Sequence, residues 1–316
     1  MSVIFATNSA IHYKSMSQST STIYKRSQVT QAYRVFDNST HAITMLPANI
    51  DNETELWFQF QWYKSGGGNS TDDGYMARVF DSNGRECFRL DVSNGYLFLS
   101  VYGNATYNTA SAFLGAGMNS IKIRYRNDGP GLTLQADLYM NGILAGTTAG
   151  TNNTRLMPRN WSFEMVDASS TTDYMSEFIC STVDLETYGL SKYDIIAAGT
   201  DNDFTGLVTN VSDDIGTSGM VGASPGDKQS FIPPTINTAK LIHSYAPNAL
   251  VWCGNTQRTV RFYLKIGGVQ YNGPNHVLTI NKQNLLQENF LLDPSDNQPW
   301  TSAKINAAEV GIEIVS

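Results

Sequence analysis

Residues that commonly build metal centres and redox sites are scarce in this chain of 316 residues, which has three cysteines and four histidines. The cysteines, Cys87, Cys180 and Cys253, are far apart, lack any CxxC spacing and stand among apolar or strand-like neighbours. They are therefore predicted to be small buried hydrophobic residues, with a bridged pair as the lesser alternative. The histidines are scattered as well, so we expect no metal-ligand cluster and no cofactor.

Charged residues are also few: they make up 16% of the chain, and the formal net charge is −7. No cluster of lysine and arginine could follow a phosphate backbone, so binding to nucleic acid or to an anionic membrane surface is not expected. No apolar run approaches the ~18 residues of a membrane-spanning helix, and the start MSVIFATNSA lacks the basic and apolar regions of a signal peptide. These features predict a protein without membrane insertion that folds in a reducing cytoplasm.

The sequence patterns of common catalytic sites are missing. The paired carboxylates E-x-D-x-x-E of a retaining glycoside hydrolase do not occur, and neither do G-x-S-x-G, H-E-x-x-H or a P-loop. We therefore predict that the protein is not an enzyme; a glycoside hydrolase with an unrecognised acid pair is an alternative. Three carboxylate pairs could hold Ca²⁺, but solvated turn carboxylates are the favoured interpretation of all three: Asp72-Asp73, Asp201 with Asp203, and Asp213-Asp214.

Apolar and polar residues alternate with a period of two along most of the chain, a pattern typical of β-strands. The stretch ELWFQFQWY (55–63) places four large apolar residues on one face, namely Leu56, Phe58, Phe60 and Trp62. Four hairpin signals with glycine after Asn or Asp follow, at Asn83-Gly84, Asn94-Gly95, Asp128-Gly129 and Asn141-Gly142. Because almost no helical period separates them, the sequence predicts an all-β fold built as an antiparallel sandwich.

Two modules are predicted, because the residue pattern changes near Tyr188-Gly189. In the first, IKIRYR…LTLQADLYMNGILAG resembles the strand, turn and late hairpin of the concanavalin-A-like (laminin-G-like) jelly roll. The resemblance covers residues 1–188 and implies a jelly-roll sandwich; domains of this shape carry sugars or hold proteins together. Residues 189–316 are predicted to form a second, smaller β-sandwich.

The chain ends NQPWTSAKINAAEVGIEIVS (297–316), where a short helix is predicted to run directly into a strand. Trp300 at N′, Thr301 at the N-cap and Ile305 at N4 fit a hydrophobic staple, so these three residues are expected to have structural roles. Gly311 among alternating apolar residues indicates that a final strand replaces the helix.

This second half resembles a module that recurs in structural proteins of tailed bacteriophages. The matching stretches are 204–231, 249–273 and 290–316, and the terminal motif is carried by Asp293-Pro294, Pro299-Trp300-Thr301, Asn306 and Val310-Gly311-Ile312. The family often carries a basic, Ala/Ser-rich segment before the R-x-V-x-F strand, and this chain has YAPNALVWCGNTQ there instead, so that strand is expected to face a different neighbour.

Several aromatic residues stand where a strand would expose them. Trp57 is out of phase with Phe58 and Phe60, and Tyr96, Tyr102 and Tyr107 lie in or beside YLFLSVYGNATY. Aromatic rings stack on sugars and anchor protein interfaces, so Trp57, Tyr102 and Tyr107 are candidates for a glycan or partner surface; packing in the core is the alternative.

Together, the resemblances imply a non-enzymatic structural component of a tailed-phage virion, in the tail, baseplate or a fibre. Its partners would be copies of itself, taken as a trimer by analogy with fibre proteins, other virion proteins, and host surface polysaccharide where it contacts the host. It would be located in the virion after synthesis in the host cytoplasm. The alternative is a lectin-like carbohydrate-binding protein that recognises a receptor.

Overall fold

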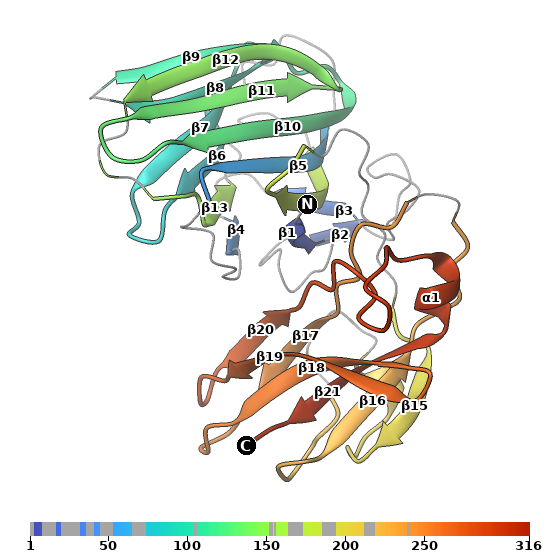
Figure 1. The fold of residues 1–316 in the computed structure, drawn as a ribbon. Coiled ribbons are helices and arrows are strands. Elements are labelled where there is room, and N and C mark those ends of the chain that lie inside the picture. The colour runs from blue at the N-terminus through green and yellow to red at the C-terminus, as the bar shows by residue number, and fades with distance from the viewer. Residues whose placement is uncertain are drawn as a thin grey trace. The chain divides into compact units, whose positions relative to one another are not determined.

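The structure is a computed structural model, and it divides the chain into two compact units, Met1–Lys192 and Tyr193–Ser316 (Figure 1). The division lies a few residues beyond the predicted boundary after residue 188. The described residues are 53–64, 74–103, 106–151, 154, 156–163, 173–184, 194–211, 219–238 and 241–316, together with the backbone of four short strands at 3–7, 17–19, 32–35 and 41–44. The predicted all-β fold is confirmed in both units.

Unit 1 contains two antiparallel sheets that share one core. The larger has the order β12-β11-β10-β5-β14-β3-β2 with β1 beside β14. Its strands are β1 (Val3–Thr7), β2 (Ser17–Ser19), β3 (Ala32–Val35), β5 (Glu55–Lys64), β10 (Gly117–Asn127), β11 (Thr133–Met140), β12 (Ile143–Thr151) and β14 (Asp173–Ser181). The smaller has the order β4-β13-β6-β7-β8-β9, formed by β4 (His41–Thr44), β13 (Asn160–Phe163), β6 (Gly74–Phe80), β7 (Glu86–Ser93), β8 (Tyr96–Gly103) and β9 (Thr106–Phe113).

The core of unit 1 forms because each strand points alternate side chains to the same side. The four apolar residues predicted on one face of β5 are all fully buried there. Trp161 on β13 lies among the rings of Phe58, Phe88 and Phe178, with centroid distances of 5.1, 5.3 and 5.1 Å. Large side chains of this kind each contribute roughly 1.5–3 kcal/mol by burial, so this aromatic cluster fixes how the two sheets pack.

The predicted hairpins are present, but their turns differ. At Asn94-Gly95 and Asn141-Gly142 both residues have positive φ, as a type I′ turn requires. At 81–85 only Gly84 has positive φ, because the buried Asp81 carboxylate accepts hydrogen bonds from the Asn83 and Arg85 amides, both at 2.9 Å. The β10–β11 connection also differs, since its positive φ values fall on Gly129 and Gly131.

The prediction that the three cysteines are buried is confirmed, and all three are free. Burial raises the pKa of the Cys180 thiol, which keeps it protonated and unreactive. Among the described residues, no helix is long and apolar enough to cross a membrane.

Unit 2 consists of a five-stranded sheet and a two-stranded ribbon. The sheet has the order β15-β16-β21-β18-β19, with strands β15 (Ala197–Asn202), β16 (Lys228–Ile232), β21 (Ala308–Ile314), β18 (Thr259–Ile266) and β19 (Val269–Val277). The ribbon pairs β17 (Asn248–Trp252) with β20 (Gln283–Gln287), and the short helices are η3 (Val208–Asn210) and α1 (Ser302–Asn306). Val260 and Phe262 of β18 are buried in one apolar cluster of this unit, and Leu264 is buried in a second cluster.

The predicted helix-to-strand ending is confirmed. The Thr301 side chain accepts a hydrogen bond from the Lys304 amide at 3.3 Å, and Trp300 and Ile305 are buried in one apolar cluster. The Trp300 Nε1 donates to the Phe290 carbonyl at 2.7 Å, so the indole is fixed at both its apolar and its polar end. The strand β21 that follows lies between β16 and β18, which places the last residues at the centre of the sheet.

Candidate functional site

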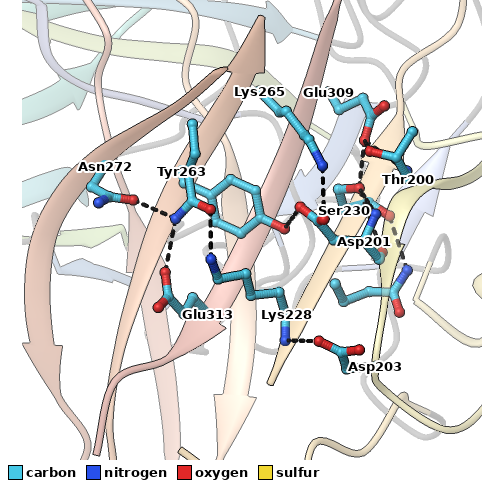
Figure 2. Close-up of polar contacts among 12 residues, drawn as sticks. Thr200, Asp201, Asp203, Lys228, Ser230, Tyr263, Lys265, Asn272, Glu309 and Glu313 are labelled. Atoms are coloured by element: carbon cyan, nitrogen blue, oxygen red, sulfur yellow. Dashed lines mark hydrogen bonds and ion pairs between the residues drawn. The ribbon is translucent and has the colours of Figure 1, made fainter. Parts of the chain in front are cut away.

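The five-stranded sheet of unit 2 has one polar face, on which side chains from non-adjacent strands meet (Figure 2). The Tyr263 hydroxyl donates to Asp201 Oδ2 at 2.9 Å, and Lys265 Nζ donates to Asp201 Oδ1 at 2.7 Å. Desolvation opposes the charge on Asp201, but the hydrogen bonds from Lys265 and Tyr263 outweigh it, so its pKa is lowered. Burial, reinforced by the Asp201 carboxylate, raises the pKa of Tyr263, and the phenol therefore acts as a neutral donor.

A second carboxylate, Glu309 of β21, is held on the same face. Its Oε2 accepts from the Ser230 hydroxyl at 2.5 Å, and from the Thr200 amide and hydroxyl at 2.8 and 3.0 Å. Desolvation raises the pKa of Glu309, yet these three hydrogen bonds prevail and the net shift is downward. The charged form of this residue therefore ties β15, β16 and β21 together.

The third carboxylate of this face, Glu313, lies toward the β19 edge. Its Oε2 accepts from Arg261 at 2.9 and 3.0 Å and from the Gln270 amide at 2.9 Å, while Gln270 in turn accepts from Lys228 at 2.8 Å. These groups bind one another across four strands, and the arrangement stabilises the sheet.

The carboxylates of Asp201 and Asp203 are not arranged as ligands for Ca²⁺. Both oxygens of Asp201 are engaged by Lys265 and Tyr263, and Asp203 accepts from the Lys228 amide at 3.0 Å. No group of three or more His, Cys, Asp or Glu side chains in the described parts of the chain is placed to hold a metal ion. The other two pairs, Asp72-Asp73 and Asp213-Asp214, lie outside the described residues.

Trp57, a predicted surface aromatic, is only 7% exposed, and the expectation of an open ring is corrected. It lies on the outer face of β5, where Lys122 and Arg124 of the neighbouring β10 lie over the ring at 5.1 and 5.6 Å. Its Nε1 donates to Glu55 at 2.8 Å. The long side chains of Lys122 and Arg124 thus cover the indole on the outer face of β5, which the alternating pattern predicts to be exposed.

Tyr102 and Tyr107, the other two predicted surface residues, face each other in the backbone register of β8 and β9. Their side chains lie outside the described residues, so their predicted role on a surface stays a prediction.

The same sheet does carry exposed aromatic rings, on the outer face of β6 to β9. Tyr96 is 47% exposed and Phe113, directly opposite it in the β8–β9 register, is 58% exposed. Their rings meet edge to face at 5.7 Å, and Phe98 lies 6.5 Å from Tyr96. Tyr75 on β6, 36% exposed, completes a group that we call the aromatic face: Tyr75, Tyr96, Phe98 and Phe113.

Ion pairs surround the aromatic face. Arg78 and Arg89 both lie over the Tyr75 ring, at 5.5 and 5.3 Å, and pair with Glu86 at 2.7 Å and Asp91 at 2.9 Å. Desolvation raises the pKa of Asp91 despite its partner Arg89. Sequence reasoning noted Tyr96 among the aromatic residues that a strand would expose but did not choose it as a candidate, and it missed the three companions. The signal was available in part, since Tyr96 and Phe98 alternate with the buried Leu97 and Leu99.

Unit 2 has a separate exposed aromatic, Trp252 at the end of β17, with 63% of its side chain accessible. It belongs to the segment YAPNALVWCGNTQ, which precedes the R-x-V-x-F strand. Gln283 lies opposite it in the β17–β20 register, and Gly254 lies near the edge of its ring.

No protein-family model and no curated protein sequence matches this chain. Among solved structures, it is similar to the binding domain of botulinum neurotoxin serotype G, at 11% identity and a TM-score of 0.42, covering 58% of this chain and 48% of that one. The receptor-binding domain of botulinum neurotoxin mosaic serotype C/D is 13% identical with a TM-score of 0.44, over 73% of this chain and 70% of that one. The T. cruzi calreticulin globular domain is 11% identical with a TM-score of 0.41, over 58% of this chain and 90% of that one. At these TM-scores the likenesses carry no inference about ligand or partner.

Proposed function

We propose that this chain is a non-enzymatic structural component of a tailed-phage virion, acting in the tail, baseplate or a fibre and assembling with copies of itself and with other virion proteins. The observation that carries the proposal is the C-terminal motif. Trp300 and Thr301 begin α1, and the Asn306 side chain accepts from the Ile236 amide at 2.8 Å and donates to its carbonyl at 2.9 Å. Gly311 lies beneath Tyr263.

These contacts support the proposal because Trp300, Thr301 and Asn306 each have a defined structural role in the terminal motif. Asp293 begins the turn that precedes α1, and its carboxylate accepts from the Ser295 amide at 2.8 Å. Lys304 of α1 pairs with Asp296 of the same turn at 2.8 Å.

The test is location. Antibody against this chain, followed by gold labelling and electron microscopy of purified particles, should decorate the tail, the baseplate or a fibre, and mass spectrometry of the same particles should detect the chain. Light scattering of the purified protein would then measure whether it forms the proposed trimer. Absence of the chain from washed particles would refute the virion role.

A second candidate function, a lectin-like protein that recognises host surface polysaccharide, is favoured by the aromatic face. Rings held on a sheet are rigid, and they offer π surface to the apolar faces of sugars at little entropic cost. A glycan array probed with the full chain should show binding that Phe113→Ala weakens and Ile143→Ala, an exposed apolar control on β12, leaves unchanged. Release of reducing sugar from a bound polysaccharide would instead support the glycoside hydrolase alternative.

A further inference from the structure

We propose that the aromatic face of unit 1 binds an uncharged saccharide chain running across strands β6 to β9. The proposal rests on the lectin-like function and names its ligand class. Its first support is the placement of the rings: Tyr75 lies on β6, Phe98 and Tyr96 on β8, and Phe113 on β9. Neighbouring strands are ~4.8 Å apart, so the rings span roughly 14 Å from β6 to β9, enough for several successive sugar rings.

The charges around the rings indicate that the ligand is uncharged. Among the described residues, Arg78 and Arg89 are the cations of this face, and each is paired with a carboxylate of β7, Glu86 at 2.7 Å and Asp91 at 2.9 Å. Both guanidinium groups are also stacked on Tyr75. A sulfated or carboxylated sugar would have to break these pairs to gain a cation, whereas hydroxyl groups need only dipoles and leave the pairs intact.

Polar groups stand next to the rings in the strand register, and Asp91, which pairs with Arg89, lies between Tyr75 and Phe98. Ser93 stands opposite Tyr96, and Ser111 stands opposite Phe98 in the strand register. The Asn94 amide donates to the Ser93 hydroxyl at 3.3 Å at the hairpin beside Tyr96. Hydroxyl and amide groups interleaved with aromatic rings suit a sugar, which presents hydroxyl groups at its rim and C–H groups on its faces.

The geometry also favours a flexible chain over a second copy of the protein. The core of a protein interface is a contiguous patch depleted of charge. On this face, by contrast, two ion pairs stand beside the rings. Phe113 stands beside Gly95 and Gly115, where added Cβ atoms would lie 3.8 and 3.6 Å from the ring, so the ring is bordered by bare backbone.

The experiment uses the full chain and three immobilised uncharged polysaccharides, dextran, mannan and laminarin, beside two anionic ones, alginate and heparin. We expect binding to at least one uncharged probe that changes little between about 0.05 and 0.5 M salt, because no net charge is engaged. Phe113→Ala and Tyr96→Ala should each weaken it about tenfold, the loss of one stacked ring. Ile143→Ala should retain it, and circular dichroism should show all variants folded.

Each other result overturns the proposal in its own way. Binding only to alginate or heparin, lost at high salt, would keep the lectin-like function and refute the uncharged ligand. Binding to an uncharged probe that both ring variants retain would place the site elsewhere. No binding to any probe would remove the lectin-like function itself, and a dimer abolished by Phe113→Ala would make this face a self-association surface.

Discussion

The ring of Tyr263 lies directly over the Cα of Gly311, across the β18–β21 pair at the centre of the unit 2 sheet. A Cβ on residue 311 would overlap the ring carbons, so glycine is required for the phenol to lie flat against β21 and reach Asp201. The pair explains why a strand near the end of the chain contains glycine, which otherwise weakens a strand. The hydroxyl then links β18 to β15, two strands that do not pair with each other.

Gly311→Ala is expected to destabilise unit 2 by about 3 kcal/mol, because the methyl group displaces the Tyr263 ring and breaks its bond to Asp201. Urea denaturation followed by hydrogen exchange of β18 and β21 peptides measures the effect. Gly219→Ala is the matched control: nothing lies within 4 Å of its added Cβ, so stability should change by less than about 0.5 kcal/mol. Equal effects of the two substitutions would contradict the packing argument.

Acid should loosen the same sheet. The folded pKa of Glu309 is below its ordinary value of 4.5, because hydrogen bonds from Ser230 and Thr200 outweigh desolvation. A lowered folded pKa contributes stability that is fully present above the unfolded pKa and is lost as the pH falls through the folded value. Protection of β21 against hydrogen exchange should therefore be constant above about pH 5 and decline below about pH 4.5.

Glu309→Gln tests this directly, since an uncharged amide does not titrate there. The variant should be less stable than the parent at pH 7 and should show a flatter decline below pH 4.5. Glu288→Gln removes a carboxylate of unit 2 that lies outside the Glu309 network, and it serves as the matched control for the loss of one carboxylate. A Glu309→Gln profile as steep as that of the parent would assign the acid loss to other groups.

The start of α1 offers a third prediction. Thr301→Ala removes the side chain that accepts from the Lys304 amide and should cost about 1 kcal/mol, while Thr301→Ser keeps the acceptor and should cost little. Thermal denaturation of the two variants provides the measurement. If both were equally destabilised, the lost methyl packing rather than the cap would be responsible.

Local patterns in the sequence were sufficient for the elements that local physics decides. The alternation in β5, the type I′ turns at Asn94-Gly95 and Asn141-Gly142, and the cap at Thr301 each depend on residues close together in the chain. The turn at 81–85 departs from the type I′ geometry that an Asn-Gly pair favours, because the Asp81 side chain supplies acceptors that the Asn-Gly pattern does not include.

Which side chains are buried or exposed on the outer faces of the sheets could not be predicted from neighbouring residues in the sequence. Trp57 is covered by Lys122 and Arg124, which reach it only because β10 pairs with β5. Likewise, Tyr75 and Phe113 join one face only through the strand order β6-β7-β8-β9. Strand order is a property of non-local pairing, so a surface formed by four strands is visible only after the sheet is assembled.

Trp252 is expected to dominate the quenching of fluorescence by acrylamide. Of the five tryptophans, four are buried and Trp252 is 63% exposed. Trp252→Phe should therefore remove the red-shifted, quenchable part of the emission, because the remaining four indoles are buried. Trp300→Phe serves as the control and should leave that part unchanged while lowering stability through the lost bond to the Phe290 carbonyl.

If the parent protein resisted quenching as strongly as Trp252→Phe does, the indole of Trp252 would be covered in solution. If acrylamide then quenched Trp252 more strongly as the protein was diluted, the covering neighbour of β17 would be a second copy of this chain.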